Sequence, residues 1–230
     1  MTEETNEEFV SLKGVSVCIG MPVDNPIPHY TTISLCNTVA RLAQMGVECS
    51  IAMQVSGVVT IARDAVLNEF LNSGMQKLFW IDSDMVWTPD DFLQLLAQST
   101  KVDVVGAAYP AKTEGPMIFY ANFDQDRKIG PYGLQEVKGL GLGFTIVDRK
   151  VCEELAAKAP LVKDQIAGIE MRSVFRVDIY EGYRRTEDMA YFADIRELGY
   201  TVWMNPLISL GHIGERQWKG AIAQAFEKKG

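Results

Sequence analysis

Along its first hundred residues the chain alternates short, continuous apolar runs with longer stretches in which apolar residues recur every three or four positions. The continuous runs, which are typical of strands buried on both faces, lie at 14–20, 47–55, 77–82 and 103–106. The stretches with helical spacing lie at 31–45, 61–73 and 88–98. This β-α-β-α-β-α-β order predicts an α/β fold with a Rossmann-like, mostly parallel sheet flanked by helices.

Local residue choices mark the ends of these helices. Gly46 and Gly74 follow the first two helical stretches, where glycine commonly ends a helix because it adopts positive φ at no steric cost. The segment Thr88-Pro-Asp-Asp91 opens the third helix with an N-cap threonine, a proline in the first turn and two acids that face the positive helix end.

From about residue 107 the pattern changes to shorter pieces separated by glycines and charged turns. Short β-like segments lie at 117–122, 134–137, 144–147, 174–179, 201–204 and 207–210, and helices are expected at 150–157, at 186–198 and in the tail from 215. No linker, repeat or low-complexity segment divides the chain. We therefore expect a single domain of residues 1–230, made of a half at 10–106 and a half at 107–230 that contains a smaller mixed β region.

Composition narrows the class of protein. The chain is 47% hydrophobic and 23% charged, as globular proteins are, and no apolar run approaches the ~20 residues that span a bilayer. The acidic N-terminus is unlike a secretory signal. Four cysteines without Cys-x-x-Cys spacing are expected to be buried free thiols, so a cytoplasmic location is expected. A net charge of −8 argues against non-specific nucleic-acid binding.

The candidate chemistry lies where the third predicted strand ends. There an apolar run delivers Asp82 and Asp84, and strand residues two apart point to the same face. Paired carboxylates at a sheet's carboxyl edge suit a hard divalent cation whose other ligands are water and phosphate oxygens. An Asp-x-Asp arises about once by chance in such a chain. The second occurrence, Asp124 and Asp126, has no buried strand before it and is expected to be a solvated turn.

Six segments, taken in order, resemble the pattern of GT-A fold, family 2-like glycosyltransferases. They are Met21–Asp24, Ala62–Asp64, Asp82–Asp84, the glycine-rich Gly139–Phe144, Thr186–Asp188 and Gly211–Gly214. The resemblance spans about residues 14–215, and the order of the segments is more specific than any single one. It implies that residues 10–106 bind a nucleotide-diphosphate sugar, with UDP favoured, and that residues 107–230 bind an acceptor. The acceptor is left open among glycan, lipid, protein and modified nucleobase.

The resemblance also implies which residues bind the donor and its metal. The implied ligands of Mn²⁺ or Mg²⁺ are Asp84, His212 and Asp82, where Asp82 contacts either a metal-bound water or the ribose. Pro22, Asp24 and Ser83 are expected in the nucleotide-sugar site. An imidazole beside a carboxylate suits Mn²⁺, which accepts nitrogen and oxygen ligands. The alternative for His212 is an ordinary packed or surface residue.

Two basic residues are candidates for contact with the diphosphate. Arg63 either meets it through the guanidinium fork or is a solvated helix charge. Lys219 lies in the C-terminal segment 211–230. This segment is either a lid that closes over the diphosphate or a static helix docked through Trp218, Ile222 and Phe226.

Acceptor chemistry is expected from an acidic pair and from three further residues. The resemblance implies that Asp188 takes the proton from the acceptor hydroxyl and that Glu187 positions the acceptor. The alternative is that both acids only stabilise a helix N-terminus. Tyr109, Gly143 and Trp87 are candidates for contact with the acceptor, although aromatic residues are more often core and a glycine can simply mark a turn.

Two other functions compete with this interpretation. Phosphatases of the haloacid-dehalogenase type also carry an Asp-x-Asp at a strand end, but on the first strand, whereas two β-α units precede it here. The second alternative is a nucleotide- or sugar-binding module on the same fold that catalyses nothing.

Overall fold

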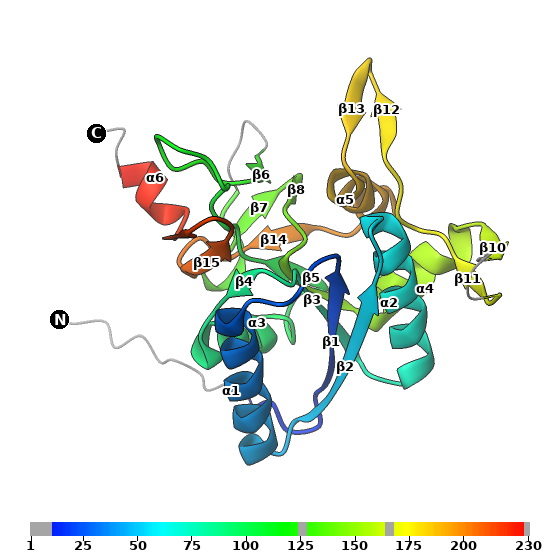
Figure 1. Ribbon diagram of the computed structural model, residues 1–230, viewed down its shortest axis with the longest axis horizontal. Helices are drawn as coiled ribbons and strands as arrows, with labels where there is room; N and C mark the ends of the chain where they lie inside the picture. The colour runs from blue at the N-terminus through cyan, green and yellow to red at the C-terminus, as the bar shows by residue number, and fades with distance from the viewer. Residues whose placement is uncertain (1–10, 124–127, 164–167, 228–230) are drawn as a thin grey trace.

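The computed structural model describes residues 11–123, 128–163 and 168–227, and within these ranges a seven-stranded sheet organises the chain (Figure 1). In spatial order its strands are β2 (Glu48–Val55), β1 (Ser16–Val23), β3 (Lys77–Ile81), β9 (Phe144–Asp148), β5 (Val104–Gly106), β14 (Val202–Met204) and β7 (Gln135–Val137). Five strands run in one direction, and β9 and β7 run against them. The predicted mostly parallel sheet is confirmed, and it draws strands from both predicted halves.

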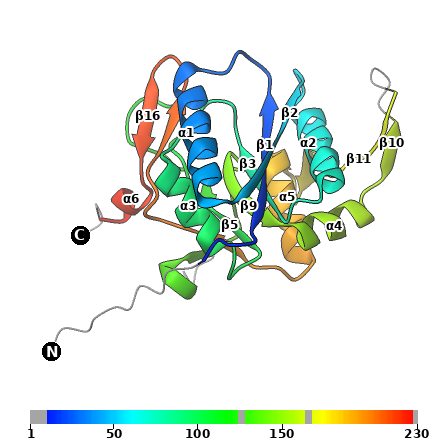
Figure 2. The same ribbon diagram turned by 90° about the horizontal axis from the view of Figure 1, so that it is seen from below.

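Helices cover both faces of this sheet (Figure 2). On one face lie α1 (His29–Met45) and α3 (Pro89–Gln98), and on the other lie α2 (Val59–Ser73), α4 (Arg149–Lys158) and α5 (Glu187–Glu197). The predicted helix ends are confirmed. Gly46 and Gly74 adopt φ of 68° and 75°, and the Thr88 and Asp91 side chains form a reciprocal capping box.

Strand alternation divides the interior into two cores. On β3, Leu78 and Trp80 pack into the core beneath α2, α4 and α5, whereas Phe79 and Ile81 pack into the core beneath α1 and α3. All four side chains are fully buried. This accounts for the continuous apolar run, because a strand covered on both faces has no polar side.

The antiparallel strand β9 lies between β3 and β5 and continues the glycine-rich segment. Two backbone hydrogen bonds hold the start of β9 in place, one from Asp82 N to Gly143 O at 3.1 Å and one from Ala107 N to Phe144 O at 3.0 Å. Residues about sixty positions beyond Asp82 are thereby brought beside it, at the carboxyl ends of the parallel strands.

The second half also forms small sheets and one further helix. In three of the sheets β6 (Ala121–Asn122) pairs with β8 (Gly139–Leu140), β10 (Leu161–Lys163) with β11 (Glu170–Arg172), and β12 (Asp178–Tyr180) with β13 (Tyr183–Arg185). In another, β15 (Leu210–Ile213) lies between β4 (Met85–Val86), which comes from the first half, and β16 (Gln217–Gly220). A 3₁₀ turn lies at Pro131–Gly133, and α6 spans Ala223–Glu227.

Two predictions for the region after residue 205 were wrong. The strand expected at 207–210 begins only at Leu210, and the tail expected to be helical from 215 first forms β16. The apolar spacing of Trp218, Ile222 and Phe226 suggested a helix, but pairing with β15 takes the first of these residues into a strand. Tertiary pairing here overrides a local pattern.

The cysteines are free thiols, as predicted, but only Cys18 and Cys152 are buried. Cys36 is exposed on α1 and Cys49 is half-buried on β2. None of the helices in the described ranges is long and apolar enough to cross a membrane.

A buried carboxylate on α2 fixes the segment that crosses this helix. Asp64 accepts hydrogen bonds from Val174 N at 2.7 Å, Phe175 N at 3.0 Å and Ser173 Oγ at 2.9 Å. The strand predicted at 174–179 therefore starts only at Asp178, since these backbone donors face a side chain instead of a neighbouring strand. Asp64 thus holds the aromatic ring of Phe175 against the sheet.

We expect Asp64→Ala to lower the free energy of unfolding by about 2–4 kcal/mol, because it leaves two buried backbone N–H groups and a hydroxyl without their acceptor. Urea denaturation measures this effect. The control is Glu69→Ala on the same helix, since Glu69 is exposed and accepts a hydrogen bond from the exposed Gln54 amide. Equal stability of the two variants would show that Asp64 does not anchor the segment.

Candidate active site

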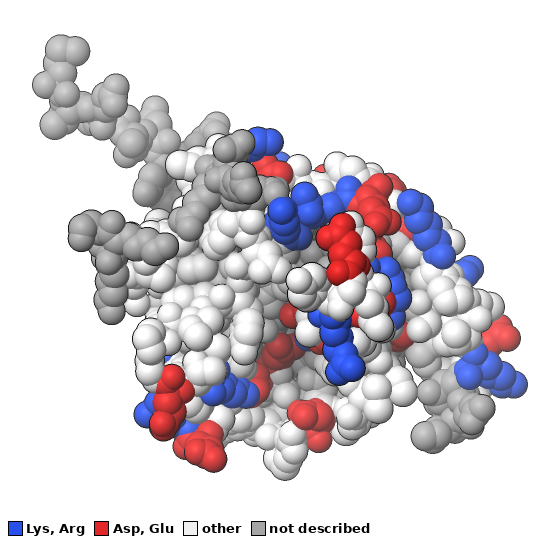
Figure 3. Space-filling view, turned by 90° about the horizontal axis from the view of Figure 1, so that it is seen from above, with Lys and Arg blue, Asp and Glu red and all other residues white. Residues whose placement is uncertain are grey.

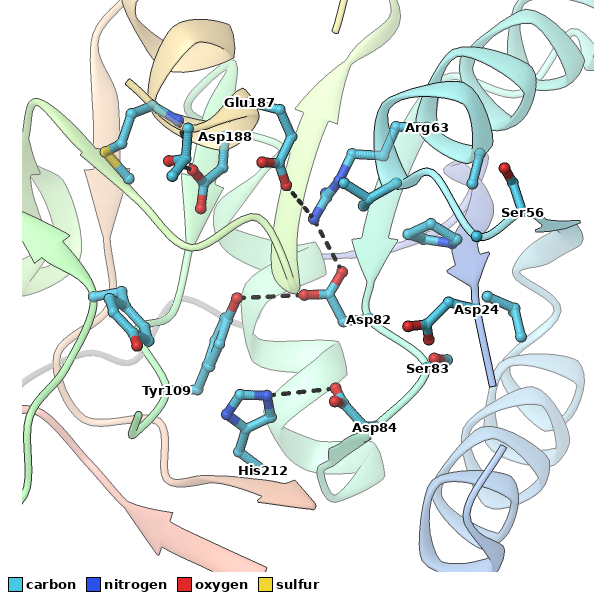
Figure 4. A pocket seen from close by; sticks show the side chains of 18 of the residues that line it. Asp24, Ser56, Arg63, Asp82, Ser83, Asp84, Tyr109, Glu187, Asp188 and His212 are labelled. Atoms are coloured by element: carbon cyan, nitrogen blue, oxygen red, sulfur yellow. Dashed lines mark hydrogen bonds and ion pairs between the residues drawn. The ribbon is translucent and has the colours of Figure 1, made fainter. Parts of the chain in front are cut away.

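A cleft of about 640 Å³ opens at the carboxyl ends of β1 and β3 (Figures 3 and 4). Figure 3 shows it as a hollow with acidic side chains inside and basic side chains at its rim. The predicted site residues that line it are Pro22, Asp24, Arg63, Asp82, Ser83, Asp84, Tyr109, Glu187, Asp188 and His212. The fold therefore brings together residues from across most of the chain.

Asp82 faces the helix α2. It follows β3 with the same parity as Leu78 and Trp80, so its side chain points to the face that α2 and α5 cover. There Oδ1 accepts a hydrogen bond from Arg63 Nη2 at 3.2 Å, and Oδ2 accepts one from the Tyr109 hydroxyl at 3.3 Å. Burial raises the pKa of Asp82, and the charge of Arg63 opposes that rise.

Arg63 is a buried cation that is only 3% exposed. The alternative that it is a solvated charge on the helix surface is therefore wrong. Its guanidinium lies 5.9 Å from the ring centres of both Trp80 and Phe175. Besides Asp82, it pairs with Glu187 at 3.6 Å, so it joins α2 to the end of β3 and the start of α5. Its Nε and Nη1 have no hydrogen-bond partner among the described residues.

The glycine-rich segment makes room for these contacts. A Cβ on Gly143 would lie 2.5 Å from Asp82 Oδ2 and 3.0 Å from the Tyr109 hydroxyl, and a Cβ on Gly141 would lie 2.4 Å from the same hydroxyl. Both glycines are therefore required for close packing of protein groups. Burial raises the pKa of Tyr109 well above its usual value, so the phenol stays protonated and donates to Asp82.

Asp84 faces a different set of partners from Asp82. The chain leaves the strand at Asp82 in a turn closed by the bond from Met85 N to Asp82 O, so strand alternation no longer applies. Asp84 Oδ1 lies 3.5 Å from His212 Nε2, and Oδ2 makes a short contact with Lys112 Nζ. Burial would raise the pKa of Asp84, but hydrogen bonds from His212 and Lys112 hold it below its usual value.

The orientation of His212 leaves one ring nitrogen for the cleft. Its Nδ1 lies 2.9 Å from the Pro110 carbonyl oxygen, which can only accept, so Nδ1 carries the proton. Nε2 points toward Asp84 Oδ1: it donates to the carboxylate when the ring is protonated on both nitrogens, and it offers a lone pair to a metal ion when the ring is neutral. An imidazole fixed in this way by a carbonyl is the usual arrangement of a metal-binding histidine.

The acidic pair begins α5, as predicted. Asp188 Oδ1 accepts hydrogen bonds from the Thr186 hydroxyl and from Met189 N. Glu187 turns toward Arg63, and burial raises its pKa although the arginine charge opposes the rise. Figure 4 shows both carboxyl groups on the wall of the cleft across from Asp84.

Three predicted site residues do not line the cleft, and one of them, Gly143, is the glycine that packs against Asp82. Trp87 is 4% exposed, packs in the core beneath α1 and α3 and donates from Nε1 to Thr38 Oγ1 at 2.9 Å, so its ring cannot stack on a ligand in the cleft. Lys219 is exposed on β16 and does not line the cleft. Asp124 and Asp126 fall outside the described residues.

Lys112 was missed at the sequence level. It lies in a segment without periodicity, between Pro110 and Pro116, and no motif marks it. Only the fold shows that its ammonium group reaches Asp84.

The charge balance of the cleft suits a cation. Its lining contains five carboxylates, from Asp24, Asp82, Asp84, Glu187 and Asp188, but one guanidinium. In the described ranges no group of three or more His, Cys, Asp or Glu side chains is arranged for a metal ion. Asp84 and His212 together offer an oxygen and a nitrogen donor, a pair that suits Mn²⁺ and leaves further positions for water or a ligand.

No protein-family model matches the chain, and no curated protein matches its sequence. Among solved structures, A197 from STIV is similar with a TM-score of 0.55 and 19% identity over 91% of both chains. GalNAc-T7, solved with UDP, GalNAc and Mn²⁺, is similar with a TM-score of 0.52 and 10% identity. That match covers 87% of this chain and 44% of GalNAc-T7. At such identities the likeness establishes the fold, which is the predicted GT-A-like architecture.

We expect Gly143→Ala to lower the free energy of unfolding by about 1–3 kcal/mol, because the added methyl group overlaps a carboxylate that Arg63 holds in place. Gly57→Ala on the cleft rim is the control, since a Cβ there has no atom within 4 Å. Chemical denaturation compares the two. A Gly143→Ala protein as stable as Gly57→Ala would contradict the tight packing at this point.

Proposed function

We propose that the protein is a metal-dependent glycosyltransferase that moves a sugar from a nucleotide-diphosphate sugar to an acceptor hydroxyl. The observation that carries this proposal is the opposition, across one cleft, of the Asp84–His212 pair and the acidic pair Glu187–Asp188. The fold shared with GalNAc-T7, a protein solved with UDP, GalNAc and Mn²⁺, supports the choice of a UDP-sugar as donor.

In this proposal the half formed by residues 10–106 binds the donor. Asp84 and His212 hold Mn²⁺ or Mg²⁺, which when bound neutralises the diphosphate and stabilises it as a leaving group. Asp82 is assigned a contact with the ribose or a metal-bound water, because Arg63 and Tyr109 already engage its two oxygens. Pro22, Asp24 and Ser83 lie along the nucleotide-sugar side of the cleft.

The acceptor half, residues 107–230, supplies the base. Asp188 Oδ1 is engaged by the helix start, whereas Oδ2 accepts no hydrogen bond from the described residues. The acceptor oxygen attacks the anomeric carbon, its proton passes to Asp188 Oδ2, and the bond to the diphosphate breaks with both electrons on the leaving oxygen. Glu187 is neutralised by Arg63 and positions the acceptor.

A phosphatase of the haloacid-dehalogenase type is not favoured. In such an enzyme the Asp-x-Asp follows the first strand, whereas here it follows β3, and β1, α1, β2 and α2 precede it. A binding module without catalysis would retain the cleft but would not need Asp188 as a base. The two predictions below separate these functions.

The metal prediction is that UDP binds in the presence of Mn²⁺ and that EDTA weakens its binding at least about tenfold, because the acidic cleft repels a diphosphate unless a cation bridges them. Asp84→Asn should weaken UDP binding similarly even with Mn²⁺ present. Asp90→Asn, which removes an exposed carboxylate from α3, is the control and should bind as the wild type does. Calorimetric titration measures all three, and equal UDP affinity with and without metal would refute the metal site.

The base prediction is that Asp188→Asn lowers turnover by about 10²–10⁴ while the affinity for UDP stays nearly constant, because the amide keeps the shape but cannot accept the proton. The measurements are sugar transfer in a screen of UDP-sugars and acceptors with Mn²⁺ and, in parallel, UDP titration. Unchanged turnover would reduce Asp188 to a helix-end charge and favour a retaining mechanism. Wild-type protein that binds UDP but neither hydrolyses nor transfers any donor would favour the binding module.

A further inference from the structure

Asp84 is paired with a positively charged side chain of the same protein, Lys112. Lys112 Nζ makes a short contact with Oδ2, while His212 Nε2 lies 3.5 Å from Oδ1. The Lys112 and Asp84 side chains are 33% and 30% exposed, so the pair lies at the mouth of the cleft and not in the core. The carboxylate that best suits a metal ion is therefore already neutralised by an ammonium group.

The backbone that carries Lys112 is anchored on both sides. The Pro110 carbonyl faces His212 Nδ1 at 2.9 Å, and the Thr113 carbonyl accepts from Trp218 Nε1 at 2.9 Å. Ala111 N donates to Ile118 O at 2.7 Å. The ammonium group, in contrast, sits at the end of a flexible, partly exposed four-carbon stem. The side chain can thus leave Asp84 while the segment that holds it stays in place.

We propose that Lys112 is an exchangeable counter-ion: it occupies Asp84 until a divalent cation displaces it, and it then binds the donor's diphosphate. This inference rests on the function proposed above. A metal ion and an ammonium group cannot share Asp84 Oδ2 because their like charges would be within a few Å of each other. The metal must therefore displace Lys112. The apparent affinity of the site for the metal is lowered, because only the fraction of molecules in which Lys112 has left Asp84 can bind it.

The released ammonium group stays beside the phosphate position. Its stem starts from an anchored backbone, so Nζ remains within a side-chain length of the metal ligands Asp84 and His212. A diphosphate bound to a metal on these ligands keeps uncompensated negative charge, and the cleft lining itself supplies only Arg63, which is occupied by Asp82 and Glu187. A lysine ammonium binds phosphate as a point charge. Lys112 is thus the described cation best placed to bind this group.

The test uses Lys112→Met, with Lys101→Met as a matched control that removes an exposed lysine from the turn after α3, outside the cleft lining. Two affinities are measured by calorimetry or, for the metal alone, by Mn²⁺ electron paramagnetic resonance. We expect Lys112→Met to bind Mn²⁺ alone about fivefold more tightly and UDP, at saturating Mn²⁺, about fivefold more weakly than the control. Lys112→Arg keeps the positive charge and should not show the tighter Mn²⁺ binding.

Opposite signs of the two changes are the signature of exchange. If Lys112→Met weakens both affinities, Lys112 only supports the structure of the site, and if it changes neither, the lysine contributes nothing there; either result overturns the proposal. Failure of the proposed function gives a different result: without a metal site at Asp84, the Asp84→Asn variant would bind Mn²⁺ with the same affinity as the wild type. The readout is metal and nucleotide binding, so it does not depend on finding the acceptor.

Discussion

The buried guanidinium of Arg63 is the interaction on which the arrangement of the cleft depends. A charge at 3% exposure is costly unless it is paired, and its partners come from elements far apart in the sequence. Asp82 ends β3 and Glu187 begins α5, while Trp80 and Phe175 flank the cation. Because all these groups must meet at one point, α2, β3 and α5 are fixed relative to one another where the parallel strands end.

This pairing separates the roles of the two aspartates. Asp82 is held by Arg63 and Tyr109, in a space that the glycines at 141 and 143 leave open, so its position is part of the packing. Asp84 lies past the strand, at the mouth of the cleft, where its partners are a histidine and a flexible lysine. One carboxylate therefore organises the site, and the other is the one for which we propose an exchange of partners.

The negative charge of the cleft lining also affects which ligands can bind there. Five carboxylates face a cleft whose buried cation is already paired, so an anionic donor requires added positive charge. Under the proposed function, a divalent ion on Asp84 and His212, together with a displaced Lys112, would supply this charge beside the donor's diphosphate. Asp188, on the opposite wall, has a second oxygen that accepts no hydrogen bond from the described residues, and under the proposed function this oxygen meets the acceptor.

The sequence by itself determined the order of elements in the first half, because buried strands and capped helices depend on local apolar spacing and on residues such as Gly46 and Thr88. It also placed Asp24, Asp82 and Asp84 at one edge of the sheet, where the carboxyl ends of parallel strands meet. The further cleft residues Arg63, Glu187, Asp188 and His212 were expected only from the resemblance to GT-A fold glycosyltransferases.

Only the tertiary structure decided which side chains meet there. The antiparallel insertion of β9 places Gly143 against Asp82, the cap on Asp64 replaces a predicted strand, and strand pairing replaces the predicted start of the C-terminal helix. Trp87 proved to be core, and Lys112, which no motif marks, reached Asp84. Such contacts join residues separated by tens of positions, and their pairing depends on packing geometry that no local spacing of apolar and polar residues encodes.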